Sequence, residues 1–286
     1  MNKKEFLTSL ETRLKKLSNE EREDILQDFS EHFEVGKAEG KTEEEIAHSL
    51  GPPGQIGKEI LATHINTIEI DANNEKVEII PTTDPTPKVE LTGKENEHTK
   101  SELIVEENDQ TLSIQTENKM RKWFNFNFFQ LSRTLTVYLP EKEYERLEVD
   151  VRNGKTQAND LVIHDVKVTS NNGKVELGNI IADSYDLRTS NGKIDLENLD
   201  GELKVKANNG KISLVTEDLD RNMDLETHNG KIDIQTENEP TNVIFDTSVN
   251  NGRVKLFGDD DYNKVIGDGD NIIRLRTNNG SITVTQ

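Results

Sequence analysis

Short runs that alternate hydrophobic and polar residues follow one another through the second half of the chain, and an Asn-Gly pair precedes each run. Side chains of a strand alternate between its two faces, so each run predicts one half-buried strand. Asn and Gly accept positive φ at little cost, so we expect each pair to form a tight corner with that geometry. The seven pairs are Asn153-Gly154, Asn172-Gly173, Asn191-Gly192, Asn209-Gly210, Asn229-Gly230, Asn251-Gly252 and Asn279-Gly280.

The spacing of these corners predicts a repeat architecture. Successive glycines are 18 to 28 residues apart, and a period of this size is typical of stacked structural units. Two architectures fit: a meander of hairpins, for which Asn-Gly is the preferred turn, and a parallel β-solenoid (β-helix). Stacked coils would place the asparagines in one hydrogen-bonded column, whereas a meander has no reason to repeat the same corner. We therefore favour the parallel β-solenoid.

Apolar residues at helical spacing set the first part of the chain apart. Phe6, Leu10 and Leu14 predict a first helix, and the capping boxes at Ser18 and Thr42 predict the starts of two more. A fourth helix follows Gly51-Pro52-Pro53-Gly54. The chain is therefore expected to be mainly β, with a small all-α domain at residues 1–63 and a solenoid body at residues 64–286.

Several segments of the helical domain resemble the HAAS signalling domain, and the resemblance covers nearly all of residues 1–62. The segments are Lys4-Glu5-Phe6-Leu7, Glu21-Arg22, Glu31-His32-Phe33, Gly40-Lys41 and Leu50-Gly51-Pro52-Pro53. HAAS domains occur in bacterial proteins whose genes neighbour PadR-like transcription regulators. The resemblance thus implies a PadR-like protein partner for residues 1–62. Most relatives continue into membrane helices, whereas a β domain follows here.

The body is similar to a second bacterial family. The pattern Leu-x-Val-x-x-x-Asn-Gly-Lys-Ile-x-Leu of residues 203–214 resembles the putative-adhesin domain of unknown function, whose members form β-solenoids. The resemblance runs from about Ile68 to Gln286. It implies a fold and a binding surface, and the adhesin name implies export.

Composition narrows the classes of function. The net charge of −20 argues against direct binding of nucleic acid, which needs clustered Lys and Arg. The absence of cysteine excludes disulfides and Cys-ligated zinc and fits a reducing compartment. Charged residues at the start of the chain do not form a signal peptide, and no stretch reaches the length of a membrane span. We expect a cytoplasmic protein.

Few residues are candidates for chemistry. The six histidines lie far apart in the sequence, and the outward carboxylates Asp195 and Asp233 belong to a row that Ser213 and Lys255 interrupt. We expect no catalytic residues, no cofactor and no enzyme, with a polysaccharide-active enzyme as a remote alternative. One acidic cluster could bind calcium, although a solvated insertion explains it better. Its candidate ligands are Asp259, Asp261, Asp268 and Asp270.

One aromatic segment follows three cations. Phe124, Phe126 and Phe128 are expected to cap the solenoid core. The alternative is an exposed interaction patch, including weak contact with a membrane surface. The residues of that patch are Lys119, Arg121, Lys122, Trp123 and Phe129.

The end of the chain predicts an unprotected edge. The strand at residues 281–285 has no helix, proline or charged tail after it, so the last coil would expose unpaired backbone groups. We expect either the acidic segment 258–271 to fold over that edge or two chains to form a homodimer through their C-terminal coils.

These observations favour a signalling or scaffold protein in which the helical head binds a partner and the solenoid is an interaction or sensing surface. The first alternative is an adhesin-like binding protein at the cell surface or envelope. The sequence does not identify the signal that the body would sense.

Overall fold

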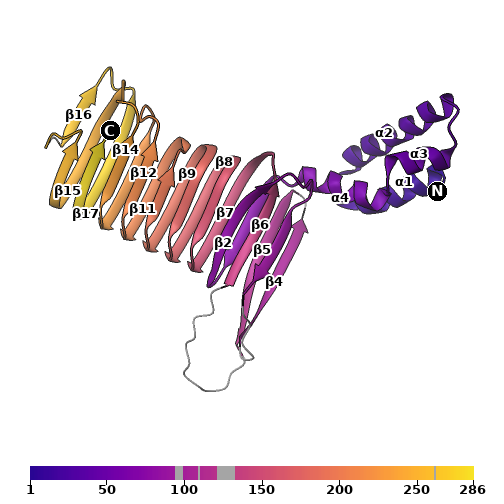
Figure 1. Cartoon of the computed structure of the whole chain (residues 1–286), viewed down its shortest axis with the longest axis horizontal. Helices are drawn as coiled ribbons and strands as arrows, with labels where there is room; N and C mark the ends of the chain where they lie inside the picture. Colours follow the sequence, from indigo (N-terminus) through magenta and orange to yellow (C-terminus); the bar gives the residue numbers. More distant parts are fainter. Residues whose placement is uncertain (94–98, 109, 121–132, 261) are drawn as a thin grey trace.

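The computed structural model describes residues 1–93, 99–108, 110–120, 133–260 and 262–286. A small group of helices lies at one end of an elongated β body, and the strands of the body run across its long axis (Figure 1). The helices end at His64 and the strands begin at Thr67.

The helical head consists of α1 (Lys3–Arg13), the short 3₁₀ helix η1 (Leu14–Lys16), α2 (Asn19–Ala38), α3 (Glu43–Leu50) and α4 (Pro53–His64). The expected capping boxes at Ser18 and Thr42 are present, and Asn2 forms a third with Glu5. The head has a small hydrophobic core, in which the rings of Phe6 and Phe33 pack edge to face with their centroids 5.4 Å apart. Within the described residues, the helices are all too short or too polar to cross a membrane.

The described part of the body forms strands on two sides of one stack. Those in the region before the first Asn-Gly pair are β1 (Thr67–Ala72), β2 (Glu75–Thr82), β3 (Lys88–Thr92), β4 (Thr99–Asn108), β5 (Thr111–Met120), β6 (Arg133–Pro140) and β7 (Glu143–Asn153). The repeat region contains β8 (Thr156–Asn172), β9 (Val175–Asn191), β10 (Ile194–Glu197), β11 (Asp200–Asn209), β12 (Ile212–Thr216), β13 (Met223–Asn229), β14 (Ile232–Thr236), β15 (Val243–Leu256), β16 (Asn263–Ile266) and β17 (Asn271–Thr285).

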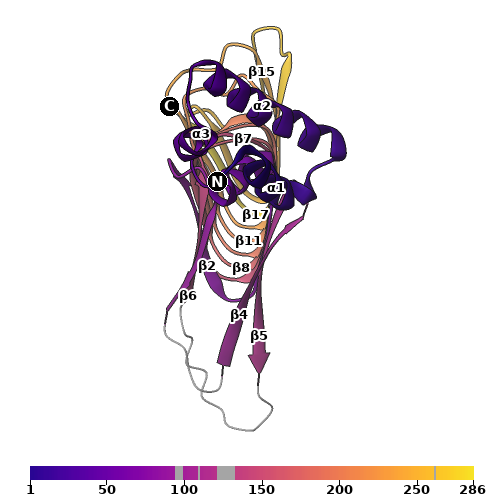
Figure 2. The same cartoon turned by 90° about the vertical axis from the view of Figure 1, so that its right-hand side faces the viewer.

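Neighbouring coils pair in parallel, which confirms the solenoid and rules out the hairpin meander. Ile194, Ile212 and Ile232 lie beside one another on β10, β12 and β14. On the other side of the stack, Asn209 of β11 lies beside Asn229 of β13. The aliphatic residues point inward from both sides and form one continuous core. Figure 2 shows the coils nested one behind another along the body.

The stack does not follow chain order at its N-terminal end. Strand β1 lies between β5 and β7, and β2 lies between β6 and β8. The coil that comes first in the sequence is therefore inside the stack. Antiparallel partners complete this end, because β4 pairs with β5 and β3 pairs with β6.

The C-terminal end is rearranged in the same way, so the expected bare edge at residues 281–285 is wrong. Strand β17 pairs with β13 and β14 on one side and with β15 on the other. Both edges of the last strand in the sequence are thus occupied. The predicted homodimer through the C-terminal coil therefore loses the free edge on which it was based.

Charge on the outer face favours this order. On the outer face of the stack, Arg274 of β17 lies directly between Asp224 of β13 and Asp246 of β15. The Nε of Arg274 is 3.7 Å from the Oδ2 of Asp246. Stacking in chain order would instead place the two aspartates side by side, and like charges on adjacent strands are destabilising.

The acidic segment covers part of the true free end, formed by β15. After Leu256 the chain turns back, and β16 pairs antiparallel with residues 243–246 of β15. Phe257 adopts a left-handed conformation with φ of 53°, and its ring meets the buried Phe245 ring at 5.9 Å. This arrangement agrees with the expectation that the acidic segment protects an edge, although the edge belongs to β15.

Candidate functional site

The asparagines of the seven corners form a single ladder along the body. Each Nδ2 donates to the Oδ1 of the asparagine in the preceding coil, at 2.8–2.9 Å. In space the order is Asn74, Asn153, Asn172, Asn191, Asn209, Asn229, Asn279 and Asn251. The ladder was expected from the repeat, whereas the position of Asn279 before Asn251 was not.

The glycines of the corners are needed because neighbouring coils pack closely there. The expectation of positive φ is wrong for six of them. Among the corner glycines, Gly252 alone has a positive φ, and its value of 157° is nearly extended. A Cβ added at Gly192 would lie 1.8 Å from the carbonyl oxygen of Gly173, and the other corners show the same contact. Any side chain at these positions would therefore overlap the backbone of the neighbouring coil.

A second column of polar corners was missed in the sequence. Asp160, Asn179 and Asn198 have φ values of 58°, 51° and 48°, which are true left-handed corners on the opposite edge of the coils. Asn179 Nδ2 donates to Asp160 Oδ1 at 2.9 Å. The spacing of 19 residues was available as a signal, but these residues lack the Asn-Gly pair that marked the first column.

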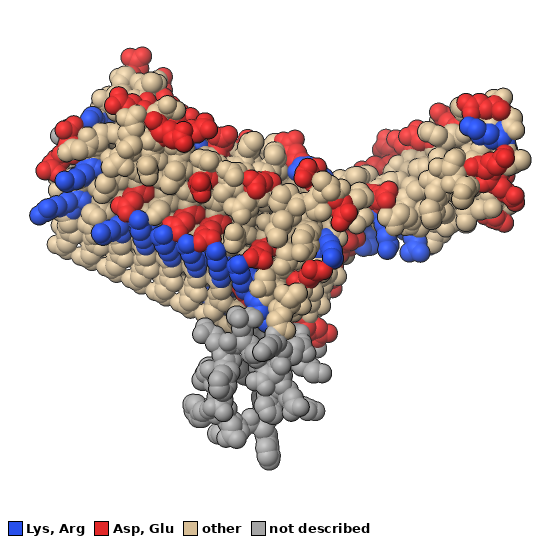
Figure 3. Space-filling view, in the orientation of Figure 1, with Lys and Arg blue, Asp and Glu red and all other residues tan. Residues whose placement is uncertain are grey.

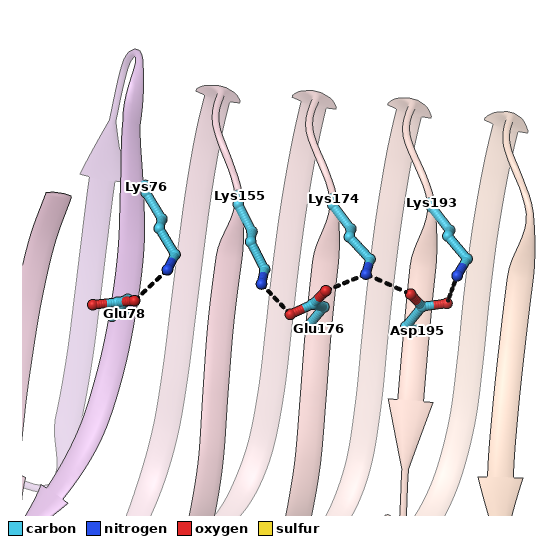
Figure 4. A network of polar contacts seen from close by, with 7 residues as sticks. All are labelled: Lys76, Glu78, Lys155, Lys174, Glu176, Lys193 and Asp195. Carbon is cyan, nitrogen blue, oxygen red and sulfur yellow. Dashed lines mark hydrogen bonds and ion pairs between the residues drawn. The ribbon is translucent and has the colours of Figure 1, made fainter. Parts of the chain in front are cut away.

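Lysines follow the asparagine ladder on six consecutive coils and form a stripe along the body (Figure 3). We call this set the lysine row, and it contains Lys76, Lys155, Lys174, Lys193, Lys211 and Lys231. Carboxylates on the same strands lie between these lysines (Figure 4). Asp195 contacts Lys174 and Lys193 at 2.7 Å each, and Asp233 contacts Lys211 at 2.6 Å. The candidate carboxylates Asp195 and Asp233 are thus held in ion pairs between coils.

These ion pairs shift the pKa values of their members. Burial acts to raise the pKa of Asp195, but hydrogen bonds from Lys174 and Lys193 outweigh it and leave that pKa below its ordinary value. The same balance, with Lys155 and Lys174 as donors, lowers the pKa of Glu176. Hydrogen bonds to Asp195 and Glu176 in turn raise the pKa of the Lys174 ammonium. Ion pairs of Lys155, Lys174 and Lys211 with carboxylates of the adjacent coil therefore bind the coils together.

The acidic candidates for a calcium site are separated by other contacts. Asp259 Oδ2 accepts from Lys264 Nζ at 3.2 Å, and Asp270 Oδ2 accepts from Asn242 Nδ2 at 2.7 Å. Asp268 lies between them in sequence, and Asp261 is outside the described residues. No group of three or more acidic or histidine side chains suited to a metal ion occurs within the described ranges.

The candidate aromatic patch lies almost entirely outside the described residues. Arg121, Lys122, Trp123 and Phe129 lie outside the described residues, as do Phe124, Phe126 and Phe128. The backbone of Lys119 belongs to β5, opposite Lys100 of β4. Core capping and surface contact by this segment both remain predictions.

The head contains an open groove of about 580 Å³ between α1, α2 and α3. Its lining combines apolar side chains with charged groups: Asn2, Lys3, Lys4, Leu7, Thr8, Glu11, Leu26 and Glu43. Lys3 joins the groove walls, because its Nζ contacts Glu34 of α2 at 2.6 Å and its N–H donates to Glu43 of α3 at 2.9 Å. The acidic face of α2 continues beside the groove, where Glu31 and Glu34 are exposed.

Comparisons with known proteins agree with both parts of the chain. The Toastrack DUF4097 family matches residues 65–162 and 150–285, and the HAAS family matches residues 5–59. No curated protein matches the chain significantly.

Two solved structures match most of the chain at low identity and low TM-score. A putative cell adhesion protein from Clostridium sporogenes is 17% identical, with 79% of this chain and 95% of that chain covered and a TM-score of 0.38. A putative adhesin from Bacteroides fragilis is 15% identical, with 77% and 92% covered and a TM-score of 0.41. Because the Toastrack matches span most of the chain, the protein belongs to the Toastrack DUF4097 family and carries a HAAS domain before its solenoid.

Proposed function

We propose that this protein is a non-enzymatic signalling or scaffold protein whose head binds a protein partner and whose solenoid is an interaction or sensing surface. The HAAS match over residues 5–59 is the observation that carries the proposal. The partner that this resemblance favours is a PadR-like transcription regulator. Such a partner works at DNA, so the proposal places the protein in the cytoplasm.

The groove of the head supports this proposal physically. Leu7 and Leu26 are half-buried in it, and exposed polar residues such as Thr8 and Glu11 surround them. An apolar centre with a polar rim is the usual composition of a protein interface. A partner helix lying in the groove would bury the two leucines and leave the charged residues on both sides of them in contact with water.

The solenoid supports the role of a surface better than that of an enzyme. Its outward carboxylates Glu176, Asp195 and Asp233 are held by lysines of the same or adjacent coils. Paired groups of this kind stabilise a scaffold, whereas acid–base catalysis needs groups that converge on a substrate. We therefore extend the proposal to the absence of catalysis.

A binding assay with the full chain tests the proposal. Thr8→Arg would place a long charged side chain in the groove, and Thr12→Arg is the matched control because Thr12 is exposed on the same helix outside the groove. We expect a purified PadR-like regulator to be retained by the wild-type chain and by Thr12→Arg, and to be lost with Thr8→Arg. Equal retention by all three chains would place the contact elsewhere, and no retention by any would contradict this partner.

Fractionation of native cells tests the proposed compartment separately. The proposal expects the protein in the soluble cytoplasmic fraction, together with the regulator. Recovery outside the cell would contradict that location and would favour the adhesin-like alternative.

A further inference from the structure

The corner at Asn251 and Gly252 differs from the other six Asn-Gly corners in its surroundings. Gly252 is exposed, whereas the glycines of the other six corners are half-buried. The difference follows from the stacking order, because the coil of β15 is the last in space and no later coil covers its corner.

At two corners within the stack, the next coil accepts a hydrogen bond from the glycine nitrogen. The N–H of Gly210 donates to the carbonyl of Asn229 at 3.1 Å, and the N–H of Gly230 donates to the carbonyl of Asn279 at 3.0 Å. Gly252 pairs with Gly280 of β17 on one side, so its equivalent N–H points to the other side, the free end of the stack. The nitrogen at this corner is therefore accessible to other chemistry.

The asparagine side chain is also held less firmly at this corner. Asn209 donates from Nδ2 to Asn191, and its Oδ1 accepts from Asn229, so both ends of its amide are fixed. Asn251 donates from Nδ2 to Asn279 at 2.8 Å, but in the described part of the chain no further asparagine donates to its Oδ1. One rotation about its side-chain bonds, at the loss of a single hydrogen bond, would bring its Cγ toward the nitrogen of Gly252.

We propose that Asn251 is a site of spontaneous deamidation and that the stack protects the other six Asn-Gly corners. In this reaction the main-chain nitrogen of Gly252 loses its proton and bonds to Cγ of Asn251. The bond from Cγ to Nδ2 breaks, and the amide leaves as ammonia. Water then opens the cyclic imide at either carbonyl, which yields aspartate or isoaspartate. Only water is consumed, and the missing side chain of glycine leaves the attacking nitrogen unhindered.

The product would weaken the free end of the solenoid. A carboxylate at this position cannot donate to Asn279, so the last step of the ladder is lost. The isoaspartate form also lengthens the main chain by one atom at a corner where the Gly280 carbonyl already touches Gly252. Ageing of the protein would thus begin at the coil of β15.

Peptide mapping by mass spectrometry tests this inference. The folded chain is incubated in mildly alkaline buffer, and the mass gain of about one dalton is followed at each of the seven asparagines. We expect loss of the amide at Asn251 to be roughly tenfold or more faster than at the other six, because those react only after local opening. In urea, all seven should react at comparable rates. Equal rates in the folded chain would overturn the proposal, and so would a faster reaction at Asn279.

A variant identifies the product. Aged wild-type protein should gain an acidic form that co-elutes with freshly prepared Asn251→Asp on ion exchange, and aged Asn251→Asp should gain no such form. Asn209→Asp is the matched control, because it adds the same charge inside the stack and leaves Asn251 intact. Ageing of Asn209→Asp should therefore still produce the additional acidic form. Its absence there would contradict Asn251 as the reactive residue.

Discussion

Each corner glycine contributes to stability because it has no side chain at the point where the neighbouring coil packs against it. The carbonyl oxygen of Gly173 occupies the position that a Cβ of Gly192 would take, and the same contact recurs from Gly154 to Gly252. The repeated glycine therefore sets how closely successive coils approach at the asparagine ladder. Backbone conformation contributes little to the requirement for glycine, because these residues are nearly all outside the left-handed region.

Two alanine substitutions separate close packing from backbone conformation. Gly192→Ala should destabilise the body by more than about 3 kcal/mol, because the new methyl group overlaps a backbone carbonyl that cannot move freely. Gly40→Ala should cost only about 1–2 kcal/mol, because Gly40 has a φ of 84° but open space around it. Urea unfolding of both variants gives the comparison. A smaller loss for Gly192→Ala than for Gly40→Ala would contradict the packing argument.

At the scale of strands, the two faces of the body use charge differently. The lysine row places like charges on six adjacent coils and relies on carboxylates between them, such as Asp195 between Lys174 and Lys193. The opposite face alternates sign from coil to coil, as in Asp224, Arg274 and Asp246. Of the two faces, the alternating one favours one order of strands over others, because a change of order would bring like charges together.

The lysine row predicts how stability depends on pH. Glu176 and Asp195 have pKa values below those of the unfolded chain, so they contribute stability that is fully present above the ordinary carboxyl pKa of about 4 and is lost as the pH falls through the folded-state values. We expect the unfolding temperature of the double variant Glu176→Gln/Asp195→Asn to decrease less steeply than that of the wild type as the pH falls below this value. Parallel profiles for the two proteins would show that these ion pairs do not contribute.

Reversal of one charge tests the cause of the strand order. Arg274→Glu would place a third carboxylate between Asp224 and Asp246 and should destabilise the body by about 1 kcal/mol, the usual scale of a surface pair. Adding Asp246→Lys should restore part of that loss, because an opposite charge again faces position 274. A double-mutant cycle measures the coupling. Additive effects of the two substitutions would mean that charge does not help to place β17.

For the molecule as a whole, the sequence was sufficient for the architecture but not for the order of the coils. The period-2 runs and the repeated Asn-Gly pairs predict parallel stacked strands, because a single coil supplies both signals locally. The insertion of β17 between β14 and β15 depends on contacts between residues about 30 to 50 positions apart, such as Arg276 with Asp246 and Asp224. No local pattern indicates those pairs. The groove of the head was missed for the same reason, since three helices form it.

The chain has no cysteine, so engineered pairs can report the order of the coils. Asp233 lies directly beside Thr283, with neighbouring strands separated by about 4.8 Å, whereas Lys255 lies one strand further away. We expect Asp233→Cys/Thr283→Cys to form a disulfide on mild oxidation and Asp233→Cys/Lys255→Cys to remain reduced. The reverse result would mean that the coils stack in chain order.

Hydrogen exchange on the full chain, with and without a purified PadR-like regulator, tests the central functional claim most directly. The proposal predicts that binding slows exchange in α1, α2 and α3 around the groove, including residues 3–11, and leaves the strands of the body unchanged. The backbone amides of the strands that carry the lysine row and the asparagine ladder serve as internal references in the same experiment. Protection confined to the strands, with exchange in the three helices unaffected, would contradict the account.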